Sequence, residues 1–192
     1  MTRAITLDGF DAMFAGNDDP WSTFAARDEA HKRDAILHAL GHGPLGRVLE
    51  LAAGNGSNSV ALAKRTLRLD ATEGTEAGTA LVRKAVGDDP RVRVERLVLP
   101  RRFPRTTYDA IVVAEILYYL TARAMAQVAR DTARALRPGG TLVLAHHRID
   151  FHDFAQHADA IHARFLRDTG VTWHAGQGTR TGRWKVRSYR PR

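Results

Sequence analysis

The sequence predicts an α/β protein with a doubly wound, mostly parallel sheet of seven strands and helices on both faces. Short apolar stretches alternate along the chain with longer segments of helical periodicity. The stretch 47–51 is apolar and leads into a turn that contains Gly54 and Gly56. Acidic residues close three of the predicted strands. Because ligands of such sheets bind at the carboxyl ends of the strands, we expect these acids at one site.

The length of 192 residues predicts one domain, and 44% apolar with 26% charged residues is typical of globular proteins. No apolar run approaches the roughly 20 residues that span a bilayer, and the polar start 1–3 precedes no secretion signal. We therefore expect a cytoplasmic protein without a membrane partner. The absence of cysteine excludes disulfides, thiolate metal sites and a cysteine nucleophile.

The net charge of +8 raises the possibility of a nucleic-acid partner. Most of the basic residues are arginines scattered among the predicted helices, with concentrations only at 101–105 and 180–192. A solvated basic face accounts for this distribution, so a nucleic-acid partner is not expected.

The first 44 residues are predicted to be helical and to form a lid over the sheet. A short helix is expected over 7–16 and a longer one over 23–40, with Pro20 and Trp21 in the turn between them. Trp21 has two interpretations, a plug in the core or part of a lid over the ligand.

The first strand, 47–51, is expected to pass through the glycine turn into a helix over 59–65. Gly54 and Gly56 allow positive φ and leave no Cβ between the backbone and a ligand. Ser57 or Asn58 is the expected cap of that helix.

The later elements repeat this alternation. Thr121 is expected to cap the most regular helix, and Pro138 with the following glycines ends it. The remaining predicted strands are 66–73, 92–98, 108–114, 141–146, 171–174 and 184–189, and the remaining helices are 75–86, 121–136 and 154–167. We therefore predict a single domain, 1–192, with a lid (1–44), a ligand-binding core (45–147) and a C-terminal helix with closing strands (148–192).

Two acids and the glycine turn have a spacing that suits a nucleoside. Glu50 ends the first strand and Glu73 the second, 23 residues later (73 − 50). Since these strand ends are neighbours, Glu73 is placed to accept hydrogen bonds from both hydroxyls of a ribose. A nicotinamide-dinucleotide fold would need a third glycine where the chain has Ser59.

Four motifs in this order resemble those of class I S-adenosylmethionine-dependent methyltransferases, over about 45–147. They are Glu50-Leu51-Ala52-Ala53-Gly54-Asn55-Gly56, then Glu73, then Tyr108-Asp109-Ala110-Ile111-Val112-Val113 before Glu115, and Leu136-Arg137-Pro138-Gly139-Gly140. The resemblance implies a Rossmann-like methyltransferase sheet, S-adenosylmethionine as cofactor and S-adenosylhomocysteine as product.

The resemblance also implies which residues contact the cofactor. Glu73 would hold the ribose, and the end of the third strand would lie against the adenine. The implied cofactor-binding residues are Trp21, Glu50, Ala52, Gly54, Asn55, Gly56, Glu73, Gly74, Leu97, Val98, Ala114 and Glu115.

A narrower resemblance is to the NodS-type N-methyltransferases, which methylate the amine of a deacetylated glucosamine in a chitooligosaccharide. It rests on Asp19-Pro20-Trp21, Glu29-Ala30-His31-Lys32, Ala114-Glu115-Ile116-Leu117-Tyr118-Tyr119-Leu120 and Ala160-Ile161-His162. The family usually has an aromatic residue where this chain has Asp28. This resemblance implies a small-molecule acceptor, for example an amino sugar.

Methyl transfer to an amine needs alignment and a group that takes the amine's proton. Glu115 after the fourth strand and His147 after the fifth are the favoured catalytic residues, with His146 as the alternate, because neighbours in a strand point to opposite faces. Three further residues are expected to contact the acceptor: Tyr118, Tyr119 and Asp150.

The chain lacks the motifs of several related methyltransferase activities. Cytosine-carbon methylation needs a cysteine nucleophile, and adenine-amine enzymes of this fold carry an Asn/Asp-Pro-Pro-aromatic turn where the chain has 114–117. The histidines at 147, 152, 157 and 162 advance ~140° per step on a helix, so no metal site is expected. Small-molecule O-methylation, a non-catalytic nucleoside-binding subunit and an RNA-associated module stay open, as do the acceptor's identity and the oligomeric state.

Overall fold

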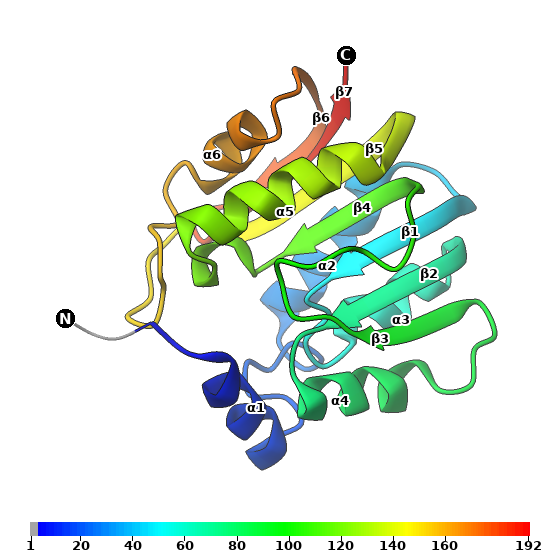
Figure 1. Ribbon diagram of the computed structural model, residues 1–192. Coiled ribbons are helices and arrows are strands. Elements are labelled where there is room, and N and C mark those ends of the chain that lie inside the picture. The colour runs from blue at the N-terminus through cyan, green and yellow to red at the C-terminus, as the bar shows by residue number, and fades with distance from the viewer. Residues whose placement is uncertain (1–3) are drawn as a thin grey trace.

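A computed structural model of the chain describes residues 4–192, which form a seven-stranded sheet of order β3-β2-β1-β4-β5-β7-β6 (Figure 1). The strands are β1 Leu45–Leu51, β2 Thr66–Glu73, β3 Val92–Arg96, β4 Tyr108–Ala114, β5 Leu136–His147, β6 Trp173–Arg180 and β7 Trp184–Pro191. Strands β1 to β5 are parallel, and β7 runs antiparallel to both β5 and β6. The predicted doubly wound, mostly parallel sheet is confirmed.

Helices cover both faces of this sheet. They are α1 Leu7–Gly16, α2 Arg27–Leu40, α3 Ser57–Ala63, α4 Glu76–Val86, α5 Ala122–Ala135 and α6 Ile161–Asp168, with a 3₁₀ turn η1 at Leu117–Tyr119. Helices α2, α3 and α4 pack on one face, and α5 and α6 on the other. Helix α1 packs beside α4, next to the carboxyl ends of the first strands (Figure 1).

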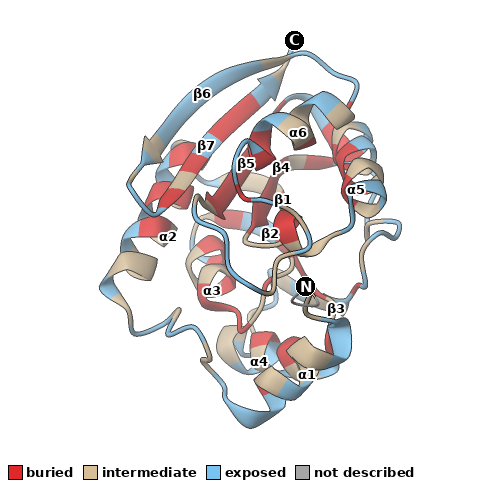
Figure 2. Ribbon diagram, turned by 90° about the vertical axis from the view of Figure 1, so that its left-hand side faces the viewer, coloured by how far each residue is buried: buried red, intermediate tan, exposed pale blue. Residues whose placement is uncertain are grey.

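Alternation of side chains along the central strands divides the apolar core in two. In β4, Ile111 and Val113 face the core under α5, while Ala110 and Val112 face the core under α2 and α3. Both layers exclude solvent from the middle of the sheet. Figure 2 shows the buried residues concentrated in the central strands and the exposed ones along β6.

The predicted cap of α5 is confirmed, because the Thr121 hydroxyl oxygen accepts a hydrogen bond from the Ala124 N–H at 3.2 Å. Thr75 caps α4 in the same way, accepting from the Gly78 N–H at 3.1 Å. The cap predicted for α3 is wrong, because this helix begins at Ser57 directly after a left-handed Gly56 and has no side-chain cap.

Other boundaries differ because tertiary contacts compete with local preference. Helix α2 begins at Arg27, four residues later than predicted, because the Asp19 carboxylate accepts the N–H groups of Thr23 and Phe24 and holds them in a turn. Helix α6 begins at Ile161 rather than 154, because the ring of Phe154 stacks on Tyr118. Strand β3 ends at 96, β5 extends back to 136, and β6 and β7 are longer than predicted.

Within residues 4–192, no helix is long and apolar enough to cross a membrane. The same residues include no group of three or more His, Asp or Glu side chains placed to hold a metal ion. The predictions about 1–3, at the start of the expected lid, lie outside the described residues.

Candidate cofactor and acceptor site

The carboxyl ends of the adjacent strands β1 and β4 carry backbone strain. Ala52 has a φ of 55° and Glu115 a φ of 53°, in the left-handed region that side chains with a Cβ rarely adopt. Strain of this kind is retained where the surrounding structure requires it, most often at functional sites. The two strained residues therefore mark the end of the sheet where we expect chemistry.

The turn after β1 needs its glycines for two different reasons. Gly54 and Gly56 have φ values of 61° and 86°. A Cβ on Gly56 would lie 3.0 Å from the Ala85 Cβ, so α4 also packs too closely for a side chain there. A Cβ on Gly54 would meet only the Phe14 ring of α1, at 3.7 Å. The exposed side of the turn at Gly54 is therefore covered by the N-terminal helix.

Glu73 at the end of β2 is tied to this turn. Its Oε2 accepts the Gly54 N–H at 3.0 Å, and its Oε1 accepts the Thr75 N–H and hydroxyl, each at 3.0 Å. Burial raises the pKa of Glu73, and the N–H donors of Thr75 and Gly54 oppose that shift. Asp70, the other acid of β2, instead accepts the Tyr108 hydroxyl at 3.0 Å. Glu73 is thus the acid of β2 that reaches the glycine turn.

Glu50 is a buried acid with an unused oxygen. Its Oε2 accepts the Ser59 hydroxyl at 2.5 Å, but its Oε1 has no hydrogen-bond partner among residues 4–192. Burial, with a smaller contribution from the charge of Glu73, raises the pKa of Glu50 to about 8. The carboxyl group therefore holds a proton at neutral pH unless a cation approaches it.

The loop between α1 and α2 is fastened to the glycine turn through Asn55. The Asn55 amide nitrogen donates to the Asp18 carbonyl at 3.1 Å and to the Asp19 carboxylate at 2.9 Å. The Thr23 hydroxyl donates to the Asn55 side-chain oxygen at 2.8 Å. Trp21, in the same loop, is 41% exposed and lies edge-on to Phe14. Trp21 is therefore on the surface of this cover and is not a core plug.

The residues expected beside the adenine lie past the end of β3, which is shorter than predicted. Leu97 is buried and donates its N–H to the Glu73 carbonyl at 2.8 Å, whereas Val98 is exposed. Both lie close to Gly74, on which Leu7 of α1 packs. The structure therefore brings Gly74, Leu97 and Val98 together under the N-terminal helix.

Glu115 is the centre of a charged cluster at the end of β4. Its Oε1 lies 2.6 Å from the Lys32 ammonium, and its Oε2 accepts the Tyr118 hydroxyl and the His147 N–H. Lys32 also binds Glu29, at 2.8 Å. Burial alone would lower the pKa of Lys32, but Glu115 and Glu29 raise it, so the side chain stays charged.

The two histidines that end β5 point to opposite faces of the sheet. His147 is partly buried beside Glu115, with its Nε2 4.0 Å from Glu115 Oε1, and its Nδ1 has no partner among the described residues. His146 is fully buried on the other face, where its Nδ1 lies 3.2 Å from His162 Nε2. Burial lowers the pKa of His146 well below its usual value. The alternate catalytic residue thus faces His162 and the ring of Tyr118, at 5.4 Å between ring centres, and not the Glu115 carboxylate.

The expected acceptor contacts lie in different surroundings. Tyr118 is buried against Phe154, at a ring separation of 3.7 Å, and burial raises its pKa well above the usual value. Asp150 accepts the Ala158 N–H and binds the ring of His157, each at 2.6 Å. Both residues hold the 150–158 segment in place, so few of their polar atoms are free to bind an acceptor. Tyr119 is partly exposed and lies edge-on to Phe10 of α1.

Sequence reasoning did not select Lys32, or its second partner Glu29, as a residue of the site. Lys32 is 4% exposed and shares the buried side of α2 with Ala35, Ile36 and Ala39. A lysine in register with apolar residues at i+3, i+4 and i+7 is a signal that it needs a buried partner.

Comparison with known proteins agrees with this geometry. Residues 48–140 match the model of a methyltransferase domain. The chain carries a class I S-adenosylmethionine-dependent methyltransferase domain. The methyltransferase uses S-adenosylmethionine and yields S-adenosylhomocysteine. A search among curated proteins gave no match.

Solved structures share the fold of the methyltransferase. The N-methyltransferase NodS from Bradyrhizobium japonicum, in complex with S-adenosylhomocysteine, matches with a TM-score of 0.83 and 19% identity over 96% of this chain and 97% of its own. A methyltransferase from Leishmania major matches with a TM-score of 0.74 and 18% identity, over 96% and 81%. The DhpI complex with S-adenosylhomocysteine gives 0.72 and 18%, over 96% and 94%. At these identities the likeness shows the fold.

The residues present fit the cofactor of the methyltransferase. The unpartnered oxygen of Glu50 can accept from an ammonium group. The glycine turn leaves space that a Cβ would fill, and Glu73 is a carboxylate beside that turn. S-adenosylmethionine, an amino acid joined to a nucleoside, has an ammonium group for Glu50 and ribose hydroxyls for Glu73.

Proposed function

We propose that the methyltransferase transfers a methyl group to the amine of a small molecule, and that Glu115 and His147 prepare that amine. The observation that carries the proposal is the cluster of Glu115, Lys32 and His147 at the end of β4, the strand that pairs with β1 ahead of the glycine turn. It places two proton acceptors and one fixed cation at the carboxyl ends of β4 and β5.

The cofactor would be held by the residues that line the end of the sheet. We assign Glu73 to the ribose hydroxyls, the free oxygen of Glu50 to the ammonium of the methionine part, and Gly54 to close contact with the ligand. The adenine would lie beside Leu97, and Trp21 would close over it as part of the lid. When bound, S-adenosylmethionine supplies a methyl group on a positively charged sulfur.

The chain's own residues then have to orient the amine and remove a proton. An amine is mostly protonated at neutral pH and has no free lone pair until that proton leaves. Glu115 already accepts from Lys32, Tyr118 and His147, so its carboxylate is fixed in orientation. We assign Glu115 to holding the amine and His147, whose Nδ1 has no partner among residues 4–192, to accepting the proton.

An amino sugar is the acceptor to test first, and NodS-type membership is part of this proposal. The fold is shared with an N-methyltransferase over nearly the whole chain. Phe151 is 44% exposed and lies edge-on to His147, with ring centres 5.6 Å apart. An exposed aromatic ring beside the acceptor site can stack on a sugar ring.

The experiment is methyl transfer from labelled S-adenosylmethionine to matched acceptors: an amino sugar, its N-acetyl derivative and the analogue with a hydroxyl in place of the amine. We expect transfer to the free amine only. Transfer to the hydroxyl analogue would identify an O-methyltransferase instead. Tight cofactor binding without transfer to any member would favour a non-catalytic binding subunit.

Two variants test the assigned residues. Glu115→Gln and His147→Ala should each lower turnover by about 10²-fold, while cofactor affinity stays within a few fold. His42→Ala, on an exposed histidine ahead of β1, is the control. If both site variants keep wild-type turnover across pH 6–9, the roles assigned to Glu115 and His147 are wrong and catalysis depends on positioning alone.

A further inference from the structure

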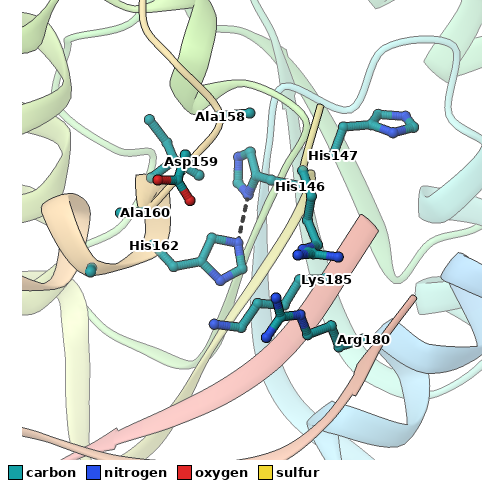
Figure 3. A pocket seen from close by; sticks show the side chains of 11 residues that line it. His146, His147, Ala158, Asp159, Ala160, His162, Arg180 and Lys185 are labelled. Atoms are coloured by element: carbon teal, nitrogen blue, oxygen red, sulfur yellow. Dashed lines mark hydrogen bonds between the residues drawn. The ribbon is translucent and has the colours of Figure 1, made fainter. Parts of the chain in front are cut away.

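A cavity of about 230 Å³ lies between α6 and the end of β5, where His146 and His147 both contribute to its lining (Figure 3). Its lining includes His146, Arg148, Asp159, His162, Arg180 and Lys185. Pockets for drug-sized ligands hold about 300–1,000 Å³, so this one suits a single functional group.

The cavity collects positive charge from three strand ends. Arg180 of β6 is paired with Lys185 of β7, which is paired in turn with His146 of β5, so these side chains share one face. None of Arg148, Arg180 and Lys185 forms an ion pair with an acid among residues 4–192. Asp159 supplies one carboxylate to the lining, against three cations. The cavity thus has an excess of positive charge.

A hydrogen bond fixes Arg148 in the cavity, although no acid among the described residues forms an ion pair with any of the three cations. The Arg148 guanidinium donates to the Thr181 carbonyl at 2.7 Å, which fixes it beside the turn between β6 and β7. Burial lowers the pKa of Lys185, and the charges of Arg187, Arg180 and Arg148 lower it further. An anion in the cavity would relieve this repulsion.

His162 adds a buried donor to the same wall. The Leu117 N–H donates to His146 Nε2 at 3.3 Å, so the proton of neutral His146 is on Nδ1 and is donated to His162 Nε2. The proton of neutral His162 is then on its Nδ1. That atom is buried, in a side chain only 5% exposed, and has no acceptor among residues 4–192. Figure 3 shows it on the side of the ring where Lys185 lies.

We propose that this cavity binds an oxyanion group, a phosphate, sulfate or carboxylate, that the methyl acceptor carries. Two arginines, a lysine and an imidazole N–H are donors that suit such a group. His147 lines the cavity as well, and its Nε2 lies 4.0 Å from Glu115 Oε1, so the cavity and the Glu115 cluster share this residue. An acceptor anchored in the cavity would therefore lie next to the proposed catalytic residues. The acceptor part of this proposal rests on the proposed function.

Binding is tested first, without cofactor or methyl transfer. Inorganic phosphate is titrated into the full chain by calorimetry, with the wild type, the double variant Arg180→Gln/Lys185→Gln, and Arg123→Gln as a control. Arg123 is exposed on α5, away from the cavity. We expect phosphate affinity to fall at least tenfold in the double variant and to stay unchanged in the control. Equal affinity in all three proteins, or no binding to the wild type at millimolar phosphate, would overturn the proposal that the cavity binds an oxyanion.

The kinetics of methyl transfer then show whether the cavity binds an anion that the acceptor carries or a free anion. An amino sugar and its phosphate ester are compared as acceptors. We expect KM to be at least tenfold lower for the ester in the wild type, and the ratio of the two KM values to approach one in the double variant. A ratio near one in the wild type, with phosphate still bound, would overturn the link to the acceptor. Phosphate binding without any methyl transfer would overturn the proposed function and leave the anion pocket intact.

Discussion

The Lys32 ammonium lies 2.6 Å from Glu115 Oε1, although 83 residues separate the two in the chain. This contact joins helix α2 to the end of β4, where Glu115 holds a strained backbone conformation. Lys32 is buried and shares its charge between Glu115 and Glu29. We interpret it as the positioning residue of the acceptor site, acting through Glu115.

Lys32→Met should lower turnover by about tenfold or more, because the Glu115 carboxylate loses the cation that orients it. It also leaves the Glu29 and Glu115 carboxylates without their shared cation, so the pH dependence of turnover should change. Lys32→Arg, which retains the charge, should recover most of the activity. Steady-state kinetics across pH 6–9 measures both effects. A Lys32→Met protein with an unchanged pH profile would show that Lys32 is only structural.

Glu73→Ala should weaken S-adenosylmethionine binding by about thirtyfold or more, the equivalent of roughly 2–3 kcal/mol for two charge-assisted hydrogen bonds. Isothermal titration calorimetry measures the change. Asp70→Asn is the matched control, since Asp70 lies on the same strand but binds Tyr108. We expect its affinity to stay within a few fold. The reverse pattern would assign the ribose to Asp70.

Gly54→Val should abolish cofactor binding while the protein stays folded. A valine at a φ of 61° costs about 1–2 kcal/mol, and its side chain would fill the space between the turn and the Phe14 ring of α1. Gly139→Val is the control, because Gly139 also has a positive φ, 75°, with open space around it. Chemical unfolding should show similar losses of stability in the two variants. If both bind the cofactor equally well, the turn has no direct role in binding.

The segment that covers the glycine turn should become more resistant to proteolysis when cofactor binds. Cleavage within residues 1–30 should slow on addition of S-adenosylhomocysteine, since Asp19 and Asn55 fasten this segment to the turn. Asn55→Ala should increase cleavage without ligand. Asp18→Asn, which removes only an exposed ion pair with Lys84, should not. Equal cutting with and without ligand would argue against a lid.

Glu50 should make stability fall as pH rises. Its pKa is about 8 in the folded protein against 4.5 ordinarily, so the folded state holds a proton that the unfolded chain has lost between those values. The free energy of unfolding should therefore decline by up to about 1.4 kcal/mol per pH unit from this group. Glu50→Gln should remove that decline. Urea unfolding of both proteins at pH 5.5, 6.5 and 7.5 tests it, and parallel curves would contradict the assignment.

Much of the fold follows from patterns a few residues long. The apolar stretch 108–114 and the capped helix after Thr121 were predicted at nearly their observed bounds, because periodicity and caps act locally. The boundaries that differ lie where a distant partner intervenes. Phe154 was predicted to begin a helix, but it stacks on Tyr118 and precedes α6. Thr23 was predicted to begin α2, but the Asp19 carboxylate holds it in a turn.

By itself, the sequence determined the α/β class, the strands whose ends carry Glu50, Glu73 and Glu115, and the glycine turn between them. These features depend on residue type and short spacing. Only the tertiary structure decided that Lys32 holds Glu115, that His147 and not His146 lies beside it, and that Arg180, Lys185 and His162 line one cavity. Most of these contacts join elements far apart in the chain, and their geometry depends on how the strands pair and the helices pack on the sheet, which no local pattern encodes.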